Sequence, residues 1–126
     1  MTGTNNVTRM LTVGVPVRDQ DRALEFYTTV LGFVTRMDVP IGAGARWIEL
    51  TPSSGGTTIA LTLASPGTPA GVETGIRLCA ADADQFRQHL LDQGASADEV
   101  LRWPGVPPMF KFRDQDGNGL EIVQDS

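Results

Sequence analysis

Residues 17–33 read VRDQDRALEFYTTVLGF, and this stretch decides the first half of the fold. Either Asp19 or Asp21 can cap a helix here, because the apolar positions that follow recur every three or four residues. Gly32 then ends the helix as a C-terminal stop. Upstream, residues 10–17 alternate apolar and polar side chains, which predicts a half-buried strand that leads into the helix.

The same order of elements occurs twice along the chain. After the first helix we expect three strands, at residues 33–39, 45–50 and 57–63, separated by turns rich in Pro, Gly and Ser. After a linker the pattern restarts with a strand at residues 74–79 and a helix that begins at Asp82 or Asp84 and ends at Gly94. Three strands follow, at residues 97–102, 108–113 and 119–124. The sequence therefore predicts one α+β domain of two βαβββ modules in tandem, whose sheets curl into a mixed-sheet cup, with boundaries at 9–63 (first module), 64–72 (linker) and 73–124 (second module).

Composition excludes several classes of function. The chain has 126 residues, enough for one domain, and its 10 basic and 15 acidic residues give a net charge of −5. We therefore expect neither nucleic acid nor a membrane surface as a partner. The polar segment 1–8 has no apolar core of an export signal, so we expect a cytoplasmic protein. The lone Cys79 and the lone His89 exclude an intrachain disulfide and a three-histidine metal site from one chain.

Two segments carry a resemblance to a known family. Residues 17–33, with their Phe-Tyr and Leu-Gly-Phe runs, and residues 110–123, FKFRDQDGNGLEIV, resemble the vicinal oxygen chelate superfamily. This superfamily includes glyoxalase I, extradiol dioxygenases and bleomycin-resistance proteins. The resemblance covers nearly the whole chain through the duplicated βαβββ layout. It implies a small-molecule site in the cup and a homodimer in which the partner helps to complete that cup.

The resemblance also implies four positions for metal ligands, on the first and last strands of each module. These positions are occupied by Thr12, Ala60, Gly75 and Glu121. Only Glu121 is a strong ligand, and one carboxylate does not hold a divalent ion against water, so we expect neither a metal nor another cofactor. One alternative is a metal-dependent lyase, isomerase or dioxygenase with a rearranged site of Glu121 and Glu49 or Glu73. Another is a metal-free enzyme that uses Glu121 as its catalytic base.

Two further features have a plain structural interpretation. Residues 114–118, DQDGN, match the opening of an EF-hand calcium loop, but the alternating strands on either side favour a hairpin turn. His89 lies in the middle of a predicted helix, which favours a surface or hydrogen-bonded histidine over a metal ligand or a base.

Strand alternation suggests which side chains line the cup. Thr12, Gly14, Gly75 and Arg77 alternate with the apolar residues that face the helices, and Trp47 and Glu49 alternate with Ile48 and Leu50. Arg77 should meet Glu121 as a buried pair, which is either structural or receives an anion of a ligand. Residues 103–110, WPGVPPMF, should form an exposed apolar loop at the mouth.

We therefore predict a protein that binds a small hydrophobic or aromatic molecule. The alternative for its two tryptophans is that both belong to the core. The predicted ligand contacts are Thr12, Trp47, Glu49, Arg77, Trp103, Met109 and Phe110, and Glu121 is the candidate catalytic residue.

Overall fold

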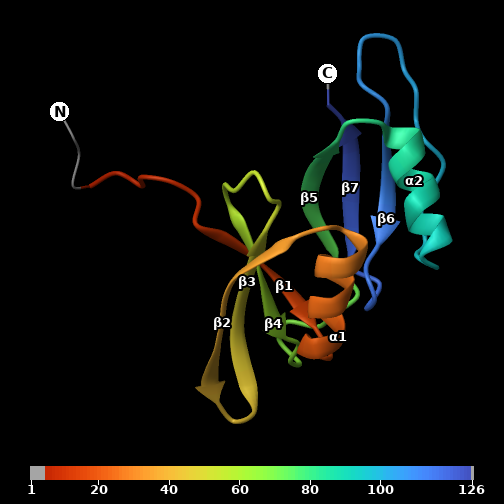
Figure 1. Ribbon diagram of the computed structural model, residues 1–126. Helices are drawn as coiled ribbons and strands as arrows, with labels where there is room; N and C mark the ends of the chain where they lie inside the picture. Colours follow the sequence, from red (N-terminus) through yellow and green to blue (C-terminus); the bar gives the residue numbers. More distant parts are fainter. Residues whose placement is uncertain (1–4, 126) are drawn as a thin grey trace.

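The chain forms two β-sheets in a computed structural model that describes residues 5–125 (Figure 1). The first sheet has the strand order β1 (Thr12–Val17), β4 (Thr58–Leu63), β3 (Ala45–Thr51), β2 (Val34–Gly42). β1 runs parallel to β4, and the other pairs are antiparallel. The first four residues of the polar N-terminal segment and the last residue of the chain lie outside the described residues.

The second sheet repeats this arrangement with fewer strands. Its order is β5 (Glu73–Ala80), β7 (Gly119–Gln124), β6 (Met109–Arg113), and its first strand again runs parallel to its last. β6 and β7 form an antiparallel hairpin. The predicted α+β class is thus confirmed.

The predicted regular strand at 97–102 is wrong. Two isolated bridges, Ala97 to Phe112 and Leu101 to Met109, are what the structure shows there. The segment still runs antiparallel along β6, since Leu101 N donates to Met109 O at 2.7 Å and Asp98 N donates to the Lys111 carbonyl at 2.8 Å. Ala, Asp and Glu at 97–99 have low strand propensity, which explains why the ladder is interrupted.

Each helix begins at the first of the two aspartates that the sequence offered as its N-cap. α1 (Gln20–Glu25) starts at Asp19, whose side chain accepts a hydrogen bond from Arg22 N, and α2 (Ala83–Asp92) starts in the same way at Asp82. The first helix continues as a π-helix, η1 (Phe26–Val30), instead of one α-helix up to Leu31. The Thr28 hydroxyl donates to the Leu24 carbonyl at 2.7 Å, a side-chain bond that bends helices.

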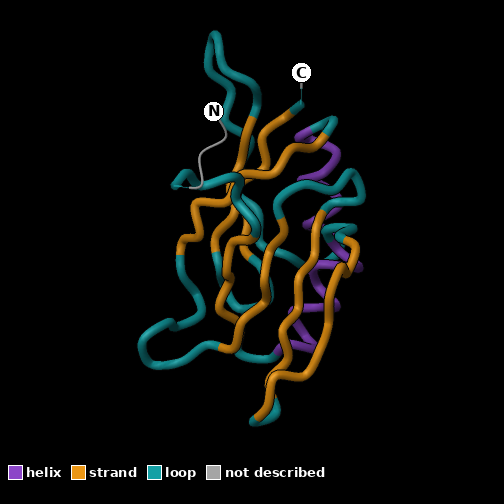
Figure 2. The backbone as a smooth tube through the Cα atoms, turned by 90° about the vertical axis from the view of Figure 1, so that its left-hand side faces the viewer, coloured by secondary structure: helices purple, strands orange, loops and turns teal. Residues whose placement is uncertain are grey.

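One core joins both halves of the chain. Each sheet turns one face toward the helices, which lie along one side of the strands (Figure 2). Strand alternation sends Ile48 and Leu50 of β3 into this core and leaves Trp47 and Glu49 on the opposite face. We call this opposite, helix-free face of each sheet its open face. None of the helices within residues 5–125 has the length and apolar character needed to cross a membrane.

Candidate functional site

An apolar slot lies between the two sheets. One wall comes from β1, β4 and the loop before β4, and the other comes from Thr74–Leu78 of β5. The slot has a volume of about 520 Å³, in the range of small-molecule pockets. Its apolar lining consists of Met10, Val13, Phe33, Ile59, Ile76 and Leu78, together with Pro52. Two glycines, three threonines and Arg77 complete the wall. β1 and β5 are the outermost strands of their sheets at this point, so no strand closes the space between them.

A hydrogen-bonded cluster on the open face of the first sheet adjoins the slot. Trp47 Nε1 donates to Glu49 Oε2 at 2.7 Å, and the Thr58 hydroxyl donates to Glu49 Oε1 at 2.8 Å. Glu49 is only 9% exposed, and these donors satisfy both of its carboxylate oxygens. The Thr12 hydroxyl donates to the Thr58 carbonyl at 3.2 Å. Thr58 also lines the slot, so three of the predicted site residues, Thr12, Trp47 and Glu49, gather beside it.

The predicted pair of Arg77 and Glu121 forms on the open face of the second sheet. Arg77 Nε lies 2.7 Å from Glu121 Oε1, but the Arg77 side chain is 70% exposed. The expectation of a buried pair is therefore wrong for Arg77, which lies on the edge strand β5, whereas the Glu121 side chain on the central strand β7 is 20% exposed. Arg77 belongs to the slot wall, whereas Glu121 does not.

A second group of charges lies next to this pair. Glu73 forms ion pairs with Arg113 and, at 3.5 Å, with Lys111. The hydrogen bond from the Arg113 guanidinium is the main reason why the pKa of the exposed Glu73 carboxyl is lowered from its usual value. Both open-face carboxylates of this sheet, Glu73 and Glu121, thus have cationic partners.

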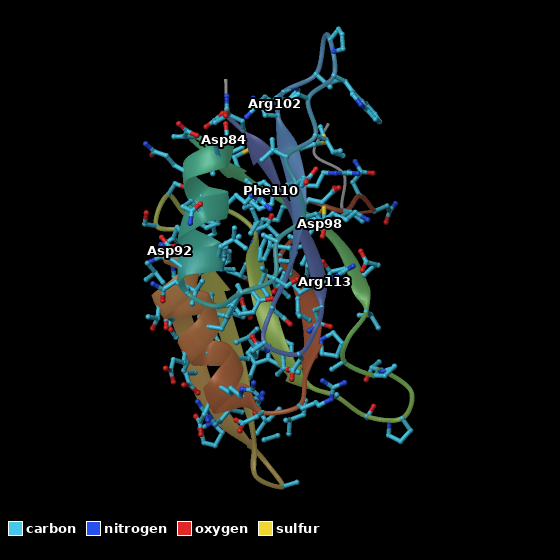
Figure 3. All side chains as sticks on the ribbon, turned by 90° about the vertical axis from the view of Figure 1, so that its right-hand side faces the viewer. Asp84, Asp92, Asp98, Arg102, Phe110 and Arg113 are labelled. Atoms are coloured by element: carbon cyan, nitrogen blue, oxygen red, sulfur yellow. The ribbon has the colours of Figure 1, made fainter. Side chains whose placement is uncertain are left out.

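The loop from 103 to 110 differs from its prediction at Phe110. Phe110 is 1% exposed and lies in the core between β6 and α2 (Figure 3), because it already belongs to β6 and alternation turns it inward. The expectation that it is exposed at the mouth of a cup is wrong. Met109 is half-buried on the open face, and Trp103 is 68% exposed in the loop. Among the described residues, the slot wall includes neither tryptophan and neither Met109 nor Phe110.

Residues 114–118 connect β6 to β7, as the hairpin prediction requires, and also fasten the two halves of the chain together. The Tyr27 hydroxyl donates to Asp114 Oδ2 at 2.9 Å. Asn118 donates through Nδ2 to the Pro16 carbonyl and accepts through Oδ1 from the backbone N–H groups of Gly71 and Val72. The polar atoms of Asp114 and Asn118 therefore make hydrogen bonds within the protein, and the motif has a structural role.

Burial governs the titration of Tyr27. Burial is the main cause that raises the pKa of its hydroxyl well above 10.0, and the negative charge of Asp114 adds to the effect.

His89 of α2 forms a hydrogen bond to the first half of the chain, because its Nε2 lies 2.8 Å from the Val30 carbonyl oxygen. It is a hydrogen-bonded histidine, as the sequence favoured.

The residues that line the slot were not among the predicted ligand contacts, apart from Arg77. Val13, Ile59, Ile76 and Leu78 have the alternation of core residues, and their side chains do face away from the open faces. They line a hollow because the two sheets separate at β1 and β5, a feature of tertiary packing. The half-buried state of Ile76 and Leu78 in β5 reflects this separation.

The sequence and the fold of this chain are similar to those of known proteins. Residues 9–122 match the family model described as the Glyoxalase/Bleomycin resistance protein/Dioxygenase superfamily. The chain belongs to this superfamily. It is 30% identical to the uncharacterized protein YurT of Bacillus subtilis strain 168, over 92% of this chain and 98% of YurT.

Two solved structures share the fold over most of their length. TnmS3, described as an antibiotic binding protein from Streptomyces sp. CB03234, superposes with a TM-score of 0.83 and 30% identity, covering 95% of this chain and 98% of TnmS3. A superfamily member from Sphaerobacter thermophilus gives a TM-score of 0.86 and 28% identity, covering 94% and 98% of the two chains.

The donor set of this superfamily member does not fit the superfamily's metal. Of the four implied ligand positions, Thr12, Ala60 and Gly75 offer no strong ligand, and Glu121 is held by Arg77. Within residues 5–125, no three His, Cys, Asp or Glu side chains lie together as metal ligands would.

Proposed function

We propose that this protein binds a small, largely apolar organic molecule in the slot between the two sheets, without a metal ion. The observation that carries the proposal is the slot itself, with about 520 Å³ of space and six apolar side chains in its wall. Burying apolar ligand surface there would contribute about 25 cal/mol per Å² before the costs of association. The threonines and Arg77 in the wall provide the few polar contacts that orient a ligand.

The comparisons support this function from a second direction. TnmS3 is described as an antibiotic binding protein, and it shares the fold and 30% of the sequence with this chain. A fold alone hosts many chemistries, so the proposal depends on the slot and on the unsuitable donor set. A binding protein needs neither a metal nor a free catalytic base, and the carboxylates Glu49 and Glu121 both have hydrogen-bonding partners here.

The test is a fluorescence titration with N-phenylnaphthylamine, a neutral apolar dye that emits strongly when it is bound in an apolar site. Thr57 lines the slot and is exposed, so Thr57→Trp should fill part of the space without disturbing the core. We expect this variant to weaken binding about ten-fold, a cost of about 1.4 kcal/mol. Ser54→Trp adds the same indole to the same loop, outside the slot wall, and is the matched control. Absence of dye binding, or equal weakening by both variants, would refute the proposal.

The metal-free part of the proposal has its own test. Protein purified without a chelator should contain less than about 0.1 equivalent of Ni, Zn, Mn or Fe, well below the occupancy of a built site. A stoichiometric metal would contradict it and would favour a rearranged site that involves Glu121.

We further propose that the protein is a homodimer. β2 exposes four large apolar side chains, Val34, Met37, Val39 and Ile41, each at least 40% accessible. Such a group on an edge strand is typical of an interface between subunits. Sedimentation should give twice the 13.5 kDa mass of one chain, and Val39→Glu should reduce it to one chain. A wild-type protein that sediments as a single chain would refute the dimer.

A further inference from the structure

A second, charged hollow adjoins the apolar slot. It has a volume of about 170 Å³ on the open face of the second sheet, and its polar lining comes from Glu73, Arg77, Lys111 and Glu121. The two hollows share Gly75, Ile76 and Arg77 in their walls. One ligand can therefore occupy both if the chain leaves room for it at these shared residues.

The backbone at Gly75 leaves that room. The pairing of β5 with β7 is irregular between Glu73 and Arg77, and Gly75 has a φ of +74°. A side chain at Gly75 would meet nothing within 4 Å, so the space beside this glycine is open. Thr74 stabilises the irregular segment, because its hydroxyl accepts from Ile76 N at 3.1 Å and donates to the Gly119 carbonyl at 2.7 Å.

The charges around the second hollow are not balanced. Within residues 5–125, three cations, Arg77, Lys111 and Arg113, form ion pairs with two carboxylates, Glu73 and Glu121, although the whole chain carries a net charge of −5. Arg113 does not line the hollow itself, but it pairs with Glu73, which does. Glu121 is paired with Arg77, and Glu73 is closest to Arg113. Lys111 is left with the longest of these contacts, 3.5 Å from Nζ to Glu73 Oε1, and its side chain is about half exposed.

Lys111 is thus the cation with the most hydrogen-bonding capacity to spare. An ammonium group has three donors, and within residues 5–125 the carboxylate of Glu73 is the one partner of this group. A negative group of a ligand that reaches the second hollow would meet this ammonium. An apolar ligand body would remain in the slot beyond Gly75.

We propose that the ligand is an amphipathic organic anion, with its apolar body in the slot and its negative group beside Lys111. This inference rests on the proposed function, since it names the chemical class of ligand for the same slot.

Two dyes with the same ring skeleton test the inference. Anilinonaphthalene sulfonate carries a negative sulfonate, whereas N-phenylnaphthylamine lacks it. We expect the sulfonate dye to bind about five-fold more tightly at low salt, which is the size of one favourable contact between partly exposed charges. This preference should shrink as salt is added, because exposed charges are screened.

Lys111→Gln should weaken binding of the sulfonate dye about five-fold and leave the neutral dye unchanged. Arg36→Gln removes one positive charge from an exposed position on β2 and is the matched control for net charge. If neither dye binds, the proposed function fails. If the neutral dye binds and the sulfonate dye is not preferred, or if both variants affect the dyes equally, the function stands and the anionic ligand is refuted.

Discussion

Replacing Tyr27 with phenylalanine removes a single hydroxyl from the junction between the two halves of the chain. Tyr27 has no exposed surface, and its hydroxyl donates to Asp114, which is 6% exposed. The Asp114 carboxylate also accepts from Asp116 N, from Asn118 N and from Asn118 Nδ2. In the variant this carboxylate keeps three of its four donors.

The expected cost follows from this geometry. A hydrogen bond to a charged group contributes about 1.5–3 kcal/mol, so Tyr27→Phe should lower the free energy of unfolding by about 2 kcal/mol. The ring contacts with Phe26 and Phe33 are kept, so no cavity term is added. Urea unfolding at pH 7 measures this change, and Tyr27→Phe in an Asp114→Asn background should cost clearly less. A loss below about 0.5 kcal/mol, the typical effect of a surface substitution, would refute the role of this hydroxyl.

The alkaline limb of the stability curve gives a second readout of the same bond. Tyr27 is the only tyrosine in the chain, so the ultraviolet signal of tyrosinate reports on it alone. Because the folded state raises its pKa, the stabilisation is complete below the unfolded pKa of about 10 and is lost as the pH rises above that value. Tyr27→Phe should lack this part of the decline. Tyrosinate formation near pH 10 in protein that is still folded would contradict a buried, hydrogen-bonded hydroxyl.

Three further variants test other parts of the structure. Asn118→Ala should cost about 3 kcal/mol in urea unfolding, because the fully buried Asn118 side chain makes three part-buried hydrogen bonds, with the N–H groups of Gly71 and Val72 and the Pro16 carbonyl; a cost near 1 kcal/mol would contradict this. Glu49→Ala, made in a Trp103→Phe background, should shift the emission of Trp47, because the indole N–H loses its carboxylate acceptor; an unchanged spectrum would show that this bond is absent in solution. Gly94→Ala should cost about 1 kcal/mol, since Gly94 ends α2 with a φ of +83°. Gly67→Ala, at a glycine without a positive φ, is its control and should be neutral.

Much of the fold could be predicted from local patterns. The period of two in residues 10–17 and the period of three to four after Asp19 identified the first strand and helix, because those periods decide which side chains can share one buried face. The strand at 97–102 could not be predicted correctly, since its apolar residues at 97 and 101 do form bridges while the intervening acidic residues interrupt the ladder. The π-helix at Phe26–Val30 could not be predicted, because the apolar period of three to four does not distinguish it from a continuing α-helix.

The candidate site could be predicted only in part. Thr12, Trp47 and Glu49 were expected on one face, and they do lie together there, because alternation along a strand fixes the face. Phe110 was misplaced because it was assigned to the loop, although it already belongs to the alternation of β6. Asp114 and Asn118 also have partners 46 to 102 positions away in the sequence, and no local pattern specifies these distant partners.

The sequence by itself determined the family, the order of the elements and the shortage of metal ligands, because these depend on residue types, spacing and periodicity. Only the tertiary structure decided which residues line the slot and the charged hollow that we propose as the binding site. The apolar slot lies between the outer strands β1 and β5, which belong to different sheets, and the charged hollow shares Gly75, Ile76 and Arg77 with it where the pairing of β5 is irregular. Both features result from how two sheets pack around one shared core, and that packing depends on contacts between residues far apart in the chain.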